Sequence, residues 1–201
     1  MTVSANARKH MTKNPIKRWM LENFKKNLVA EVVALNPTSI LDVGCGEGFI
    51  AEAIMAQLPQ VTYRGIDMDE TAVSLAQELN PKAEISTGDV LNLQFKDESF
   101  DLVICSEVLE HVTPPLAALK ELHRVSKQHL ILSVPHEPLF WGINLLTLNH
   151  IKSFGNAPGH INHWTTGGFK KFVTPLITLE TTRAPFPWTL VRGTKKPTPS
   201  L

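Results

Sequence analysis

The sequence predicts an α/β fold, in which helices cover both faces of a mostly parallel sheet. Short apolar runs alternate with amphipathic helical segments through the middle of the chain. One of these runs leads into glycines at alternate positions, Gly44, Gly46 and Gly48. The next run ends at Asp67, about 20 residues after the glycines. With 201 residues, of which 43% are hydrophobic, the chain can bury the core of one domain.

The predicted elements follow one another in a regular order. A first helix begins at Pro15, after Asn14 as its N-cap, because proline is accepted in a first helical turn. Its apolar residues recur at helical spacing down to Asn36 and Pro37, which end it. Further helices are predicted over residues 49–58, 71–79, 115–125 and 166–173. Strands are predicted over residues 39–45, 62–67, 83–87, 100–106, 129–134, 177–184 and 188–194.

The chain divides into one domain with short additions at its ends. We expect an N-terminal tail and helix over residues 1–38, the domain over 39–196 and a tail over 197–201. The alternation stops over residues 136–165, where an apolar run precedes a glycine-containing loop. An insertion there lies near the carboxyl ends of the strands, where open α/β sheets bind ligands. We interpret it as a lid over an acceptor site; alternatively, its apolar run completes the core.

The glycine loop predicts an adenosine-containing cofactor, because bare main chain admits a ligand and the Asp67 carboxylate is placed to bind a ribose. The loop has Phe49 where the dinucleotide fingerprint needs its third glycine, and it carries Glu47 close to Asp42. These carboxylates would disfavour a pyrophosphate and attract a cation, such as the sulfonium and amino group of S-adenosylmethionine (SAM). Two alternatives to SAM stay open. The loop could bind a nicotinamide or flavin cofactor, or it could be a turn that binds no ligand.

Four successive motifs resemble those of the class I SAM-dependent methyltransferases. They are DVGCGEG at 42–48, GID at 65–67, GDV at 88–90 and FDLVICSEVLEH at 100–111. Their order and spacing are those of the family, over roughly residues 38–136. The resemblance implies a Rossmann-like three-layer sandwich with a seven-stranded, mostly parallel sheet whose last strand is antiparallel. It also implies that SAM lies along the carboxyl ends of the first four strands.

The resemblance carries over to single positions of the predicted SAM site. Asp67 would bind the ribose hydroxyls, while Met68 would pack on the adenine. Asp89 would accept from the adenine amino group, although an aspartate after a strand is often only a turn former. The predicted cofactor-binding set is Asp42, Gly44, Cys45, Gly46, Gly48, Asp67, Met68, Asp89, Val90 and Ser106.

The segment Glu-Val-Leu-Glu-His at 107–111 predicts either a metal site or an acceptor pocket. If Glu107 opens a helix, its side chain and those of Glu110 and His111 face one way. Such a group suits a divalent cation such as magnesium, manganese or zinc. The order resembles metal-binding motifs of ubiquinone-pathway O-methyltransferases and of small-RNA 3′-terminal 2′-O-methyltransferases. In the latter a further ligand precedes a Trp-Thr pair, and His160 has a similar place here.

Without a metal, the same residues would cap a helix and line the acceptor pocket. An imidazole titrates near neutrality, so a histidine could then remove a proton from the acceptor. The candidates for this catalytic role are His111, His160 and His163, with His136 as a further histidine of the same region.

The sequence therefore predicts a SAM-dependent methyltransferase that modifies a small molecule, at a hydroxyl or carboxyl oxygen. One alternative is a metal-dependent RNA ribose 2′-O-methyltransferase. Another is a non-catalytic subunit that binds SAM or a nucleotide. A net charge of +1 and a single tyrosine argue against a nucleic-acid partner, which needs phosphate contacts and stacking platforms.

The cysteine content and the lack of long apolar runs predict a cytoplasmic protein. Cys45 and Cys105 are expected to be free thiols in a reducing compartment. The first 14 residues hold no apolar core of a secretory signal. The chain has no run of 18 or more apolar residues, so we expect no membrane span.

Overall fold

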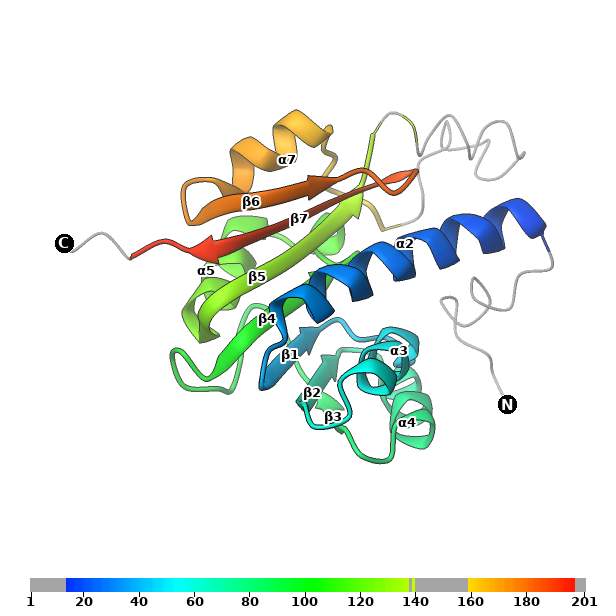
Figure 1. Cartoon of the computed structure of the whole chain (residues 1–201). Helices are drawn as coiled ribbons and strands as arrows, with labels where there is room; N and C mark the ends of the chain where they lie inside the picture. Colours follow the sequence, from blue (N-terminus) through cyan, green and yellow to red (C-terminus); the bar gives the residue numbers. More distant parts are fainter. Residues whose placement is uncertain (1–13, 138, 140–158, 198–201) are drawn as a thin grey trace.

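The computed structural model describes residues 14–137, 139 and 159–197, and these form a seven-stranded sheet between two layers of helices (Figure 1). The order of the strands across the sheet is β3-β2-β1-β4-β5-β7-β6. The strands are β1 (Ser39–Val43), β2 (Thr62–Asp67), β3 (Glu84–Thr87), β4 (Phe100–Ser106), β5 (Ser126–Pro135), β6 (Ile177–Arg183) and β7 (Trp188–Lys195). The helices are α2 (Pro15–Leu35), α3 (Phe49–Gln57), α4 (Glu70–Leu79), α5 (Pro115–Val125) and α7 (Thr166–Val173), with a 3₁₀ turn η1 (Leu109–His111).

The direction of the strands confirms the predicted sheet. Strand β1 pairs in parallel with β2 and with β4, and the pairs β2–β3 and β4–β5 are parallel as well. Strand β7 runs antiparallel to both of its neighbours, β5 and β6. The strand order reverses on either side of β1, so β1 and β4 meet at the switch point where open α/β sheets bind ligands.

Alternate side chains of each central strand supply two separate cores, which makes the molecule a three-layer sandwich. In β1, Ile40 packs with α2 and α3, whereas its neighbour Leu41 packs with α5 and α7. A third, small cluster joins α4 to β3 and the glycine loop through Cys45 and Ile85. Figure 1 shows α2, α3 and α4 on the near side of the sheet. The two-sided burial explains why the central strands are apolar at successive positions.

The N-terminal helix has the predicted start and is part of the sandwich. The side chain of Asn14 accepts hydrogen bonds from the main chain of Ile16 and Lys17, and Pro15 occupies the first helical position. One face of α2 is buried against the sheet through Phe24, Leu28 and neighbours. Helix α2 therefore covers the sheet between the glycine loop and the last strands.

The remaining predictions differ in detail. Strand β5 begins at Ser126, three residues before the predicted start, directly after α5 ends. Both cysteines are buried and free, as expected.

Most of the predicted lid and both predicted tails fall on residues 1–13, 138, 140–158 and 198–201, outside the described residues. No described helix combines the length and the apolar character needed to cross a membrane.

Candidate donor cleft and acceptor site

The loop after β1 adopts a backbone conformation that favours glycine at each alternate position. Gly44, Gly46 and Gly48 have φ angles of 78°, 54° and 79°. A Cβ on Gly44 would stand 2.1 Å from a methyl carbon of Val108, and one on Gly48 would stand 2.4 Å from the side chain of Asn80. The sequence pattern therefore reflects a tight fold of this loop, as well as any ligand that lies on it.

Asp67 lies against the glycine loop at the carboxyl end of β2. Its Oδ2 accepts a hydrogen bond of 2.8 Å from the main-chain N–H of Gly46, and its Oδ1 accepts one of 2.9 Å from that of Asp69. The main-chain N–H groups of Gly44 and Cys45 both donate to the carbonyl of Ile66. These bonds fix the carboxylate at the edge of the cleft, where its remaining lone pairs can accept from a ligand.

Asp42 is buried beneath the same loop. The hydroxyl of Tyr63 donates to its Oδ2 over 2.5 Å. Burial raises the pKa of Asp42 to about 7, the Tyr63 bond opposes this change, and the negative charge of Asp67 adds to it. Burial and the nearby charge of Asp42 also raise the pKa of the Cys45 thiol far above its usual value, so Cys45 is not a reactive thiolate here.

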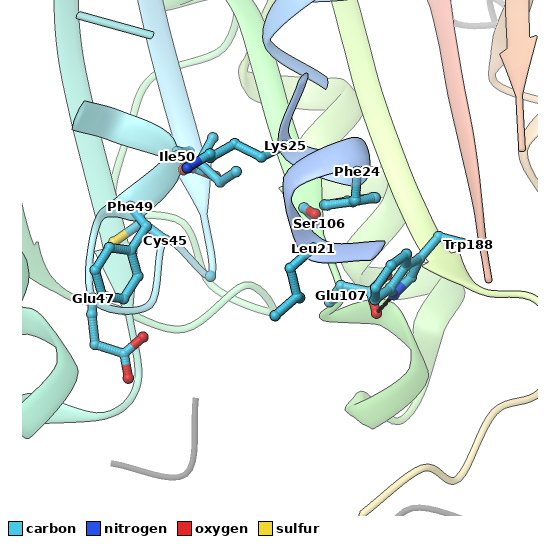
Figure 2. Close-up of a pocket in the computed structure, with 12 residues that line it drawn as sticks. Leu21, Phe24, Lys25, Cys45, Glu47, Phe49, Ile50, Ser106, Glu107 and Trp188 are labelled. Atoms are coloured by element: carbon cyan, nitrogen blue, oxygen red, sulfur yellow. Dashed lines mark hydrogen bonds between the residues drawn. The ribbon is translucent and has the colours of Figure 1, made fainter. Parts of the chain in front are cut away.

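Two cavities adjoin the glycine loop. The larger, of about 450 Å³, extends from Asp67 and Met68 past Gly88 to Glu110 and His160. The smaller, of about 110 Å³, lies between the loop and α2 and is shown in Figure 2. They share five lining residues, so they form one cleft with two parts; these are Gly44, Glu47, Ser106, Glu107 and Trp188.

The cleft gathers most of the predicted cofactor-binding set. The larger part is lined by Gly44, Gly46, Asp67, Met68, Val90 and Ser106. The smaller part adds Asp42 and Cys45. Gly48 and Asp89 line neither part: Gly48 is the N-cap residue of α3, and Asp89 accepts the main-chain N–H of Leu91 over 2.8 Å. This bond to Leu91 is typical of an aspartate that forms a turn, and the bond of Asp89 to an adenine stays a prediction.

The predicted helix at Glu107 is wrong. Glu107 has a φ of 59°, the residues after it form only the short turn η1, and α5 begins at Pro115. Its carboxylate accepts from Trp188 Nε1 over 2.5 Å and from Ser133 Oγ over 3.3 Å. The left-handed backbone turns Glu107 toward β5 and β7. As a result, Glu107 does not share a face with Glu110 and His111.

The other three predicted metal ligands do meet. One potential ligand atom from each of Glu110, His111 and His160 lies within 4.8 Å of the others. Glu110 and His160 are buried, whereas His111 is exposed. Because oxygen and nitrogen ligands suit a borderline divalent cation, the residues fit a three-ligand site without Glu107.

The chain holds this group together by hydrogen bonds between two distant segments. The side-chain amide of Asn162 donates to the carbonyls of Leu109 (2.9 Å) and Val112 (2.7 Å). The main-chain N–H groups of Ile161 and Asn162 both donate to the carbonyl of Glu110. Turn η1 is thereby bound to the segment that carries His160.

The histidines differ in their surroundings. His111 Nδ1 is 2.8 Å from the carbonyl of Gly159, and because a carbonyl only accepts, Nδ1 carries the proton and Nε2 the lone pair. His160 and His163 both approach the buried carboxylate of Glu137, at 3.8 Å and 4.0 Å from Nδ1. Only His111 and His160 line the cleft; His163 and His136 do not.

Sequence reasoning missed four residues of this region: Lys25, Glu137, Asn162 and Trp188. Trp188 forms a wall of both parts of the cleft, and its partner Glu107 is 81 positions away. Lys25 comes from the first helix, which carried no motif. No local pattern could have indicated these contacts, because each joins segments that only the folded sheet brings together.

Comparisons with known proteins agree with this architecture. A family model described as "Methyltransferase domain" matches residues 41–133, which include the glycine loop, Asp67 and turn η1. Residues 41–133 are therefore similar to methyltransferase domains. Among similar proteins, the ubiquinone biosynthesis O-methyltransferase of Pseudomonas putida (strain W619) is 30% identical over 161 residues, covering 76% of this chain and 65% of that protein. The corresponding protein of Pseudomonas paraeruginosa is 34% identical over 109 residues, covering 52% and 46%. The chain thus spans less than two thirds of these relatives.

Solved structures share the three-layer fold of this chain. The PH0226 protein of Pyrococcus horikoshii OT3 superimposes with a TM-score of 0.70 at 19% identity, over 92% of this chain and 93% of that one. Magnesium protoporphyrin IX methyltransferase of Synechocystis PCC 6803, solved with bound SAH, superimposes with a TM-score of 0.68 at 22% identity, over 92% and 89%. At such identities the likeness supports the three-layer fold.

Proposed function

We propose that this protein transfers the methyl group of SAM to an oxygen atom of a small molecule. The observation that carries the proposal is the Asp67 carboxylate, held by the Gly46 amide at the edge of a cavity that the glycine loop bounds. A carboxylate there can accept both hydroxyls of a ribose, while bare main chain admits the rest of the nucleoside.

The charge of the cleft supports SAM over a dinucleotide. Carboxylates of Glu47, Asp67, Asp69, Glu107 and Glu110 line its two parts. Within a cavity of low dielectric, such groups favour a sulfonium and an ammonium and disfavour a pyrophosphate. The methyl donor is cationic, and its product SAH has a neutral sulfur.

The proposed reaction is a direct displacement at the methyl carbon. The acceptor oxygen forms a bond to this carbon, the carbon–sulfur bond breaks, and the sulfur keeps the electron pair. The protein contributes by holding the three atoms in line. The acceptor proton passes to a base, for which His111 is suited because the Gly159 carbonyl fixes its Nδ1–H and directs the lone pair to Nε2.

A divalent cation is a further prediction for this site. Glu110, His111 and His160 would hold it, and it would supply a Lewis acid that lowers the pKa of an acceptor hydroxyl. A histidine that binds a metal through its lone pair cannot also act as a base. The metal and the histidine base are therefore alternatives for the same step.

The acceptor class follows from the relatives and from the charge. Curated relatives carry the name ubiquinone biosynthesis O-methyltransferase, which favours a phenolic or similar hydroxyl. The acidic lining of the cleft is unfavourable for an RNA phosphate backbone. The cytoplasmic location stays a prediction.

The test is a transfer assay with labelled SAM and a panel of phenols, carboxylic acids, quinol precursors and short RNAs. We expect transfer to a small hydroxyl compound, and calorimetric binding of SAM and SAH without binding of NAD. Asp67→Ala should weaken SAM binding about tenfold or more, because two charge-assisted hydrogen bonds are lost. Asp97→Ala is the matched control, since its carboxylate is exposed and lies outside the cleft.

The same assay decides between the alternatives. Binding of NAD but not SAM would reject the proposal, and SAM binding without transfer to any acceptor would favour a non-catalytic subunit. Turnover that stops after complete chelation and returns with magnesium, manganese or zinc would support the metal. Unchanged turnover after chelation would leave His111 as the base.

A further inference from the structure

The loop between β3 and β4, residues 88–99, forms one wall of the larger part of the cleft through Gly88 and Val90. These residues, all of which the structure describes, contain no helix or strand. The first turn of the loop is closed locally, because the carbonyl of Asp89 accepts from the main-chain N–H of Asn92 over 3.0 Å. Beyond this turn the loop depends on another element for its position.

Arg124, in the last turn of α5, binds the main chain of this loop. Its Nη2 donates to the carbonyl of Leu93 over 2.9 Å, and its Nη1 donates to that of Phe95 over 2.7 Å. A planar guanidinium presents its donors in a fixed fork, so the two carbonyls are held at a set spacing. The further pair with Asp97 contributes little, because that carboxylate is 73% exposed.

Glu121, one turn earlier on α5, completes this contact. Its Oε1 and Oε2 accept from Nε and Nη2 of Arg124 over 2.8 Å and 2.7 Å, which makes the pair bidentate. Its Oε2 also accepts from the main-chain N–H of Leu93 over 3.1 Å. Hydrogen bonds from Arg124 lower the pKa of Glu121, so both groups are charged at neutral pH. The pair therefore holds Leu93 by both its N–H and its carbonyl.

The position of Leu93 determines the position of the cavity wall. Leu93 and Val90 are three residues apart, and both are buried in the core that the sheet shares with α5. Met68, which follows β2, lines the same part of the cleft as Val90. The base of a donor whose ribose binds Asp67 would lie in this part of the cleft. A displacement of the loop would therefore change the contact with the base.

We propose that Arg124 and Glu121 are positioning residues for the donor, which hold Val90 in place against the base by binding the main chain of the loop. This inference rests on the proposed function. Neither side chain lines either part of the cleft, so the pair acts through the loop and does not touch the donor.

The experiment compares SAH with S-ribosylhomocysteine, in which a hydroxyl replaces the base, each titrated calorimetrically into the full chain. In Arg124→Met, SAH affinity should fall about tenfold, whereas affinity for the ligand without the base should change less than twofold. Arg124→Lys should stay impaired, because one ammonium cannot reproduce the fork. Lys120→Met removes an exposed cation from the same helix and should leave both affinities unchanged.

Hydrogen exchange of the same samples gives a second readout. In Arg124→Met the amides of residues 90–97 should exchange about tenfold faster than in the parent, while those of β4 and β5 should not change. Glu121→Gln keeps the size of the side chain but loses the charge, and it should cause the same local effect with about threefold weaker SAH binding. This milder variant carries the test if Arg124→Met does not fold.

Equal weakening of both ligands, or unchanged SAH affinity, would overturn the positioning role. Faster exchange over the whole sheet would show that Arg124 serves only the stability of the fold, which would overturn it as well. If the parent binds SAH but not the ligand without the base, the exchange measurement decides. A parent that did not bind SAH would contradict the proposed function itself, whereas faster exchange confined to residues 90–97 would still be expected in Arg124→Met.

Discussion

Asp42 lies beneath the glycine loop, where its carboxyl group is withdrawn from water and bonded to the Tyr63 hydroxyl. The group carries a proton up to an unusually high pH, because burial disfavours its charged form more than the Tyr63 bond favours it. In the unfolded chain at neutral pH, the same carboxyl group is ionised. The stability of the fold around the glycine loop should therefore depend on pH.

The pH dependence of stability should report this proton. The pKa of Asp42 is about 7 in the folded protein, against an ordinary value of 3.8 for an aspartate. Between these values the native state holds a proton that the unfolded state has lost, so the free energy of unfolding falls as the pH rises from about 4 to about 7. The contribution is up to about 4 kcal/mol.

Urea unfolding at several pH values checks the prediction. In Asp42→Asn the amide oxygen still accepts from Tyr63, but this pH dependence should be lost. The free energy of unfolding of the parent, relative to that of Asp42→Asn, should fall steadily over the window and stay constant above it. A constant difference from pH 4 to 7 would show that Asp42 titrates near its usual value.

At the scale of elements, the acceptor side of the cleft depends on the contact between turn η1 and the segment at 159–165. Asn162 supplies two side-chain hydrogen bonds to the turn, and the main chain supplies two more. The two segments lie about 50 positions apart in the sequence. Their contact sets the distance between Glu110 or His111 on one segment and His160 on the other.

Asn162→Ala should therefore affect turnover more than donor binding. Removing the amide leaves the carbonyls of Leu109 and Val112 without this donor and allows the two segments to separate. We expect kcat to fall about 10- to 100-fold, because small errors in position are costly in a displacement reaction. SAH affinity should change less than twofold, since Asp67 is unaffected.

Steady-state kinetics and calorimetry of the same samples separate these effects. Asn162→Asp, which keeps the size of the side chain but cannot donate when ionised, should behave like Asn162→Ala. A normal kcat in both variants would mean that the main-chain bonds alone hold the segments together.

At the scale of the whole molecule, Glu31 joins the beginning of the chain to its end. It is 1% exposed on α2, and its carboxylate pairs with Arg183 on β6 and with Arg192 on β7, the latter over 2.9 Å. Thr181 donates to it as well, over 3.1 Å. These partners are about 150 positions away in sequence, so the carboxylate fixes α2 across the last two strands.

Glu31→Gln should destabilise the fold by about 3 kcal/mol, because the buried carboxylate of Glu31 is lost as the counter-charge of Arg183 and Arg192, and Arg192 keeps only its pair with Glu180. Arg183 is partly exposed and can regain water, which limits the loss. Urea unfolding gives the free energy, and Glu22→Gln on the same helix is the control, expected within about 0.5 kcal/mol of the parent. A loss as small as that of the control would mean that apolar packing alone holds α2.

The sequence by itself determined the local pattern of the sheet and the donor loop. The spacing of apolar residues and the residues that begin or end elements predicted nearly every strand and helix. These signals, such as the capping residue Asn14, act within a few positions of the chain. The sequence also predicted the donor loop, with its glycines at 44, 46 and 48, because this loop is one continuous segment. It predicted Asp67 because this residue follows the loop at a regular distance.

Only the tertiary structure decided which distant side chains complete the cleft. The left-handed backbone at Glu107, stabilised by Trp188, replaced the expected helix, and no local signal distinguishes the two. Lys25, Glu31 and Asn162 likewise gain their contacts from segments about 20 to 150 positions away. The physical reason is that hydrophobic periodicity specifies the faces that become buried, whereas contacts across the sheet depend on how all the layers pack together.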